Sequence, residues 1–194
     1  MSDNFNIKNK STIARQISSV HFLDPLKIVE KMNIQLGMKI AHFGCSNGYF
    51  TLPIAEKIGE NGIIYALDIL EQKINFLRDR AKFFKLSNII FSKVNLEERG
   101  GSKLENDSID WVVIINMLYQ NRDKSKIIGE AKRILKKTGR ILIIEWNNSD
   151  DYIGPQNQSR ISREEIIRIT RKHGLGIMEE IPVSDFHFGL ILAK

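Results

Sequence analysis

The residues best suited to chemistry form a short glycine-containing segment and one acid that follows it. The segment reads Phe43-Gly44-Cys45-Ser46-Asn47-Gly48, and Asp68 comes twenty residues after the second glycine. Glycine accepts backbone conformations closed to other residues and lets a ligand approach the chain closely. A carboxylate at the end of the following strand can accept hydrogen bonds from both hydroxyls of a ribose. The pattern indicates a turn that binds a nucleoside.

The spacing excludes two common phosphate-binding loops. A dinucleotide fingerprint requires Gly-x-Gly-x-x-Gly, whose second and third glycines are replaced here by Ser46 and Tyr49. A P-loop is excluded because no Gly-Lys-Ser/Thr follows the turn. A ligand that carries a ribose but no pyrophosphate fits better, and S-adenosylmethionine is such a ligand.

Alternating strands and helices must position these residues. Short apolar runs predict strands at 39–43, 63–67, 89–94, 111–115 and 141–144. Helical patterns lie at 24–33, 71–85, 122–139 and 162–174, and a further helix opens after the glycine turn. Asp24-Pro25 and Ser162 are the expected start signals for two of them, and Thr138-Gly139 is the expected stop for the third. Such alternation predicts an α/β fold with a doubly wound, mostly parallel sheet.

The end of the chain predicts a hairpin. Two final strands at about 177–181 and 186–192 lie too close in sequence for a helical crossover, so they must be antiparallel. They bring the predicted sheet to seven strands, with the last strand antiparallel. No repeat or linker divides the chain, so we expect a polar N-terminal extension at 1–20 and one domain at 21–194.

Composition narrows the class of protein. The 194 residues are 42% hydrophobic and 27% charged, which is ordinary for a soluble globular domain. No apolar run approaches the roughly 20 residues that span a bilayer, and the polar start is no signal peptide. We therefore expect a cytoplasmic protein without a membrane span. One cysteine, Cys45, and four scattered histidines exclude a disulfide framework and predict no metal site.

The net charge of +6 raises the question of nucleic acid. Residues 122–140 hold eight Lys and Arg against Asp123 and Glu130, a balance that equals the excess of the whole chain. The segment also carries an apolar stripe at helical spacing, so its lysines are most simply the solvated face of an amphipathic helix. Nucleic acid is a possible partner that this distribution does not favour.

On these residues the chain resembles the class I S-adenosylmethionine-dependent methyltransferases, and within them the type 11 group that includes quinone-biosynthesis enzymes. The resemblance covers about residues 22–194. The family's first motif, Asp-x-Gly-x-Gly-x-Gly, aligns with residues 42–48, and its second-strand acid aligns with Asp68. An acid that commonly meets the adenine amino group aligns with Asn95, and Asn116-Met117-Leu118-Tyr119 matches the run before the active-site loop.

The resemblance implies S-adenosylmethionine as the cofactor and methyl transfer as the activity. It implies cofactor-binding roles for His42, Gly44, Ser46, Gly48, Asp68, Asn95 and Asn116. The candidates for a catalytic group are His187 and Tyr119, neither assigned as the base.

Three functions stay open. The first is a methyltransferase that acts on a small molecule, and the second is an RNA or protein methyltransferase that uses the basic helix at 122–140. The third is a member of the fold that binds a cofactor or partner without turnover. It is motivated by His42, Ser46 and Asn95, which replace an acid, a glycine and an acid of the family pattern.

Overall fold

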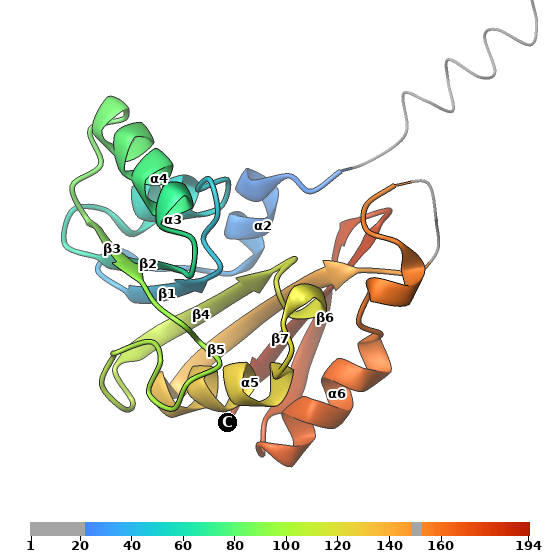
Figure 1. Ribbon diagram of the computed structural model, residues 1–194. Coiled ribbons are helices and arrows are strands. Elements are labelled where there is room, and N and C mark those ends of the chain that lie inside the picture. Colours follow the sequence, from blue (N-terminus) through green and yellow to red (C-terminus); the bar gives the residue numbers. More distant parts are fainter. Residues whose placement is uncertain (1–21, 149–152) are drawn as a thin grey trace, which may run out of the picture.

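The computed structural model describes residues 22–148 and 153–194, so the extension expected at 1–20 lies outside the described residues. The described chain builds a seven-stranded sheet in the order β3-β2-β1-β4-β5-β7-β6 (Figure 1). The strands are β1 Lys39–Phe43, β2 Ile63–Asp68, β3 Ile89–Lys93, β4 Ile109–Ile115, β5 Leu135–Trp146, β6 Gly176–Ser184 and β7 His187–Ala193. The helices are α2 Pro25–Lys31, α3 Thr51–Ile58, α4 Glu71–Phe83, α5 Lys124–Ile134 and α6 Arg163–Lys172, with 3₁₀ turns η1 Leu118–Gln120 and η2 Asn157–Ser159.

The sheet confirms the predicted fold class. The neighbouring pairs from β3 across to β5 are all parallel, whereas β7 runs antiparallel to both β5 and β6. The reversed strand is the second arm of the predicted hairpin, because a short turn cannot return the chain in a parallel direction. Strand order reverses between β1 and β4, where open α/β sheets bind their ligands.

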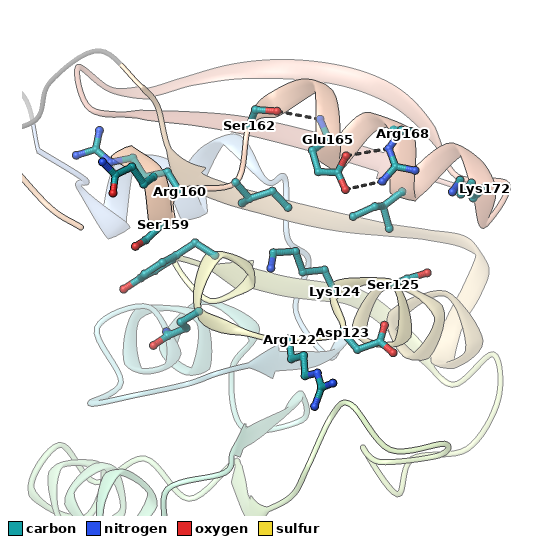
Figure 2. Close-up of a pocket in the computed structure, with 15 residues that line it drawn as sticks. Arg122, Asp123, Lys124, Ser125, Ser159, Arg160, Ser162, Glu165, Arg168 and Lys172 are labelled. Carbon is teal, nitrogen blue, oxygen red and sulfur yellow. Dashed lines mark hydrogen bonds and ion pairs between the residues drawn. The ribbon is translucent and has the colours of Figure 1, made fainter. Parts of the chain in front are cut away.

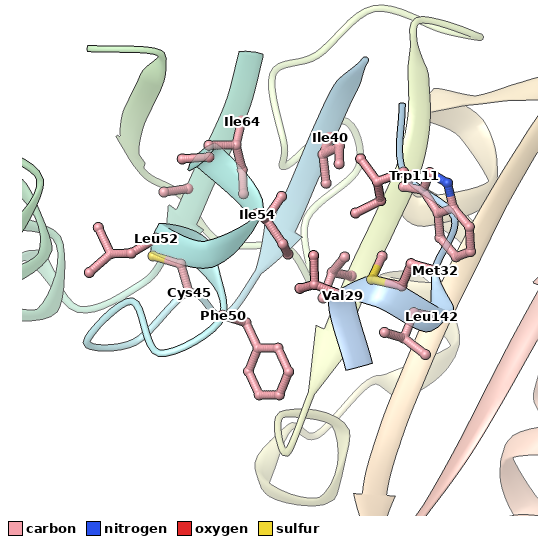
Figure 3. Close-up of a cluster of buried hydrophobic side chains, with 14 of the residues drawn as sticks. Val29, Met32, Ile40, Cys45, Phe50, Leu52, Ile54, Ile64, Trp111 and Leu142 are labelled. Atoms are coloured by element: carbon pink, nitrogen blue, oxygen red, sulfur yellow. The ribbon is translucent and has the colours of Figure 1, made fainter. Parts of the chain in front are cut away.

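Helices cover both faces of the sheet. On one face lie α2, α3 and α4, and on the other lie α5 and α6 (Figure 1). Side chains alternate between these layers along each strand. In β4, Trp111 and Val113 join the first core, while Val112 and Ile114 join the second. Figure 3 shows the first core, in which Met32 of α2 lies among the strand side chains.

Two of the predicted helix starts are confirmed by their caps. Asp24 Oδ1 accepts hydrogen bonds from the backbone nitrogens of Leu26 and Lys27 at 3.1 and 3.3 Å. Ser162 Oγ accepts one from Glu165 N at 3.1 Å. These bonds satisfy amide groups that a helix leaves unpaired in its first turn.

No helix in the described part of the chain is both long and apolar enough to cross a membrane.

The prediction that the basic helix ends at Thr138-Gly139 is wrong. Helix α5 stops at Ile134, and β5 begins at the next residue. Ile109 pairs with Leu135 but Trp111 pairs with Arg140, so residues 136–139 form a bulge in β5. A Cβ on Gly139 would lie 3.0 Å from the backbone oxygens of both Asp110 and Ile109 in β4. Glycine thus suits a close approach between β5 and β4, and in the sequence the same glycine has the appearance of a helix stop.

A buried carboxylate fastens the long β3–β4 connection to α5. Glu130 is 5% exposed and accepts hydrogen bonds from Ser102 N and Oγ at 3.0 and 2.5 Å. Arg133 donates to the same carboxylate, at 2.8 Å from Nε and 2.7 Å from Nη2. Burial acts to raise the pKa of Glu130, but the bonds from Arg133 and Ser102 outweigh it and hold the pKa below its ordinary value.

We predict that Arg133→Met lowers the free energy of unfolding by about 2–3 kcal/mol, because Glu130 is left buried without its cation. Urea unfolding measures the change. Arg168→Met is the matched control, since Arg168 pairs with Glu165 on an exposed helix face. Its expected effect is below about 1 kcal/mol. Equal effects of the two substitutions would contradict a structural role for Glu130.

Candidate cofactor site

A cavity of about 470 Å³ opens at the carboxyl ends of β1, β2, β3 and β4. Its wall includes Gly44 and Ser46 after β1, Asp68 at the end of β2, Asn95 after β3 and Asn116 after β4. Five of the seven residues expected to bind cofactor thus meet in one cavity, at the place where strand order reverses. A cavity of this size and position is typical of a small-molecule site.

The glycine turn holds its shape through left-handed residues. Gly44 has φ +68°, and a Cβ there would lie 2.9 Å from Met117 Cγ. Ser46 has φ +49°, so it takes the conformation for which the family pattern uses glycine. Its backbone nitrogen donates to Asp68 Oδ2 at 2.9 Å. The serine therefore preserves the turn, although a non-glycine residue in this region carries strain.

Asp68 joins two loops and still has capacity for a ligand. Its Oδ2 accepts from Ser46 N, and its Oδ1 accepts from Leu70 N at 2.9 Å. Each carboxylate oxygen can accept a second hydrogen bond. The carboxylate lies in the cavity wall, so both oxygens can also meet the hydroxyls of a ribose.

His42 and Gly48, expected to bind the cofactor, do not line this cavity. His42 lies on the same side of β1 as Ile40, under α3, and its Nδ1 lies 2.8 Å from Thr51 Oγ1. Burial lowers the pKa of His42 to about 4. Gly48 has φ +84°, and a Cβ there would lie 2.1 Å from Leu77 Cδ1. Gly48 thus serves the packing of the turn against α4.

Asn95 lines the cavity, and its side chain also bonds to its own loop. Oδ1 accepts from Glu97 N at 3.1 Å, and Nδ2 donates to Glu98 Oε1 at 3.0 Å. An amide oxygen can accept a second hydrogen bond, so Oδ1 can still meet a ligand donor. The expected contact of this oxygen with an adenine amino group stays a prediction.

The Asn116 side chain is held by a hydrogen bond to His187. Asn116 Nδ2 lies 3.0 Å from His187 Nε2, and Ser184 Oγ lies 2.7 Å from His187 Nδ1. Burial, followed by the charge of Arg160, lowers the pKa of His187 to about 4. A neutral imidazole with both nitrogens engaged orients Asn116 and is not a free base. In the arrangement described, Asn116 Oδ1 is buried and has no hydrogen-bond partner among the described residues.

Glu145, which sequence reasoning left as an ordinary strand end, holds the loop after β4. Its Oε1 accepts from Met117 N at 2.9 Å and from Leu118 N at 2.6 Å, and the side chain is fully buried. Burial raises the pKa of Glu145 to about 7 against the effect of these bonds. The available signal was an acid at the end of the apolar run Ile141–Ile144.

Tyr119 faces a different cavity. This second cavity, of about 970 Å³, lies between η1, the start of α5 and α6 (Figure 2). Gln120 lines both cavities, so η1 forms the wall between them. Burial, followed by the charge of Glu145, raises the pKa of Tyr119. The two catalytic candidates thus lie apart, with His187 behind the first cavity and Tyr119 in the second.

Much of the charge in residues 122–140 is used inside the molecule. Half of the eight basic side chains contact an acid or an aromatic ring. These contacts are Lys126 with Asp123 at 3.2 Å, Arg133 with Glu130 at 2.7 Å, Lys136 with Asp110 at 2.7 Å, and Arg140 over the Trp111 ring at 5.8 Å. The segment is therefore less of a free cationic surface than its composition indicates.

The sheet order and the cavity together define an α/β protein with a cavity at its switch point. A family model described as "Methyltransferase domain" matches residues 34–181. The chain belongs to this methyltransferase family.

Sequence relatives agree with the family. A demethylmenaquinone methyltransferase of Lactococcus lactis is 28% identical over 128 residues, which is 66% of this chain and 50% of the relative. One of Bacillus mycoides is 23% identical over 145 residues, 75% of this chain and 58% of the relative. The chain thus spans about half the length of the curated relatives it matches.

Solved structures agree with the fold. A SAM-dependent methyltransferase from Aquifex aeolicus superposes with a TM-score of 0.80 at 22% identity, covering 88% of this chain and 89% of that one. A putative type 11 methyltransferase from Sulfolobus solfataricus gives 0.69 at 22% identity, with coverage of 90% and 94%. At this identity the likeness establishes the fold.

The buried histidines contribute a stability that is lost on acidification. His42 and His187 have a pKa of about 4 when folded, so in the unfolded chain these two groups bind more protons between pH 6.5 and 4. Their contribution is complete above pH 6.5 and decreases as the pH falls toward 4, while the raised pKa of Glu145 acts in the opposite direction. From pH 7 to 4.5 we expect a loss of about 2 kcal/mol per histidine. Urea unfolding of wild type and His42→Gln at both pH values measures this, and an unchanged pH dependence in the variant would contradict it.

Proposed function

We propose that this protein transfers a methyl group from S-adenosylmethionine to a small-molecule acceptor. The observation that carries the proposal is Asp68, whose carboxylate lies in the wall of the switch-point cavity and ties the glycine turn to the end of β2. Membership of the methyltransferase family supports it.

The residues present fit the proposed cofactor. Asp68 can accept from ribose hydroxyls, and Ile69 and Leu96 give the same cavity an apolar wall suited to a base. The side chains of Asn116 and Asn121 also line it, and each has a buried oxygen without a partner among the described residues. Buried acceptors of this kind need donors. Besides its ribose hydroxyls, S-adenosylmethionine offers two amino groups as donors, that of its methionine and that of its adenine.

The chain's contribution to the reaction is mainly one of position. When bound, S-adenosylmethionine supplies a methyl group on a sulfonium, which is already activated for transfer. Gly44 and Ser46 let the backbone come close to the ligand, and Asp68 fixes the ribose. Glu145 and His187 keep the loop after β4 and the Asn116 amide in place. Holding the reactants in line can supply most of the acceleration, and a base is needed only for a poorly nucleophilic acceptor.

A small-molecule acceptor is favoured over RNA by the basic segment. Since Lys126, Arg133, Lys136 and Arg140 contact an acid or a ring within the chain, the free cationic surface of the segment is smaller than its composition indicates. Several curated relatives are named for demethylmenaquinone, a small molecule. Ser46 takes a left-handed backbone conformation, which supports cofactor binding by the turn.

We predict that calorimetry detects binding of S-adenosylhomocysteine to wild type, and that Asp68→Asn weakens it by about tenfold or more, since one charged acceptor is lost. Asp110→Asn is the matched control. Asp110 also accepts a backbone hydrogen bond, from Lys39 at 2.8 Å, but at the amino ends of the strands.

Two outcomes would count against the proposal. If wild type does not bind S-adenosylhomocysteine at millimolar concentration, the cofactor assignment fails. If Asp68→Asn and Asp110→Asn bind it as tightly as wild type, the ribose contact is assigned to the wrong residue.

A further inference from the structure

The cavity contains an amide whose orientation is fixed by a carboxylate. Asn121 Nδ2 donates to Glu97 Oε1 at 3.0 Å. An ionised carboxylate only accepts hydrogen bonds, so the amide nitrogen must face Glu97 and the oxygen must face away from it. The hydrogen bond from Asn121 is the main cause that lowers the pKa of Glu97, which keeps this side chain ionised at neutral pH.

Glu97 is itself held in place. Besides Asn121, it accepts from the backbone nitrogens of Arg122 at 3.2 Å and Asp123 at 3.0 Å. Three donors on one carboxylate bind the β3–β4 connection to the loop before α5. The Asn121 side chain is therefore held in one orientation by its hydrogen bond to Glu97. Its Oδ1 is buried without a partner among the described residues.

The position of Asn121 in the cavity limits which ligand donor it can meet. In the proposed function, the ribose contacts Asp68 at the end of β2. Asn121 follows η1, and its bond to Glu97 joins it to the connection that leaves β3. Leu96 of that connection and Ile69 after β2 line the same cavity, whereas Gly44 and Ser46 follow β1 and Asn116 directly follows β4. The base of a nucleoside therefore belongs with Asn121, and the amino acid part with the glycine turn.

We propose that Asn121, oriented by Glu97, recognises the exocyclic amino group of the cofactor's adenine. This inference rests on the proposed function. Asn95 occupies the position expected for this contact, but its oxygen already accepts one bond, from Glu97 N. The Asn121 oxygen is buried with no partner among the described residues, so it has the greater need of a ligand donor.

The proposal makes the base specificity of the site measurable. An adenine amino group donates to Asn121 Oδ1, whereas the 6-oxo group of hypoxanthine presents a second acceptor at that atom. Calorimetry of wild type with S-adenosylhomocysteine and with S-inosylhomocysteine gives the ratio of the two dissociation constants. We expect the adenosyl compound to bind roughly tenfold to a hundredfold more tightly, as for a buried polar group left unpaired.

Variants then locate the contact. Asn121→Leu keeps the size of the side chain and removes the acceptor, so the ratio should fall to within about threefold of one. Asn121→Ala is a second variant for the same test, checked for folding by circular dichroism. Asn75→Ala, on an exposed part of α4, is the control, in which the wild-type ratio should persist.

Each outcome decides the inference. Loss of discrimination in Asn121→Leu or Asn121→Ala, with retention in Asn75→Ala, supports it. Retention of the wild-type ratio in both Asn121 variants overturns it. Equal affinity of wild type for the two compounds overturns it while leaving the proposed function intact, because the cofactor site still binds. Failure of wild type to bind either compound overturns both.

Discussion

The site depends on one carboxylate, that of Asp68. It accepts backbone hydrogen bonds from Ser46 and Leu70, so it connects the turn after β1 to the chain leaving β2. This link adds to two backbone hydrogen bonds at the same place, from Gly44 N and Cys45 N to Leu67 O at 2.8 and 3.0 Å. Since its oxygens can accept more than one bond each, the same group can shape the site and still contact a ligand.

Three other acids also hold backbone segments in place by accepting hydrogen bonds from backbone amides. Glu145 holds the start of the segment after β4, Glu97 holds its end before α5, and Glu130 holds the β3–β4 connection. Hydrogen bonds between charged carboxylates and backbone amides are stronger than those between neutral groups. They suit long connections that have no helix of their own to order them. The cavity wall is thus rigid at both ends of residues 116–123.

Comparison of the sequence with the structure shows which signals were local. The caps at Asp24 and Ser162 and the strand before Gly44 follow from side chains within a few residues, and they are as predicted. The end of α5 was mispredicted because Gly139 is placed by contact with the neighbouring strand β4, in which Ile109 pairs with Leu135. Periodicity within one segment contains no information about such a partner.

The sequence alone determined the sheet class, the antiparallel last strand, and the conjunction of a glycine turn with Asp68, because these follow from alternation and spacing along the chain. Only the tertiary structure decided which polar residues reach the cavity. His42 lies against Thr51 of α3 instead, and Asn95 bonds to Glu97 N of its own loop. Asn121 joined the wall through Glu97, twenty-four residues earlier in the chain. Side-chain direction depends on the partners that the fold brings near, whether close or distant in sequence, so a motif locates a site but does not list its contacts.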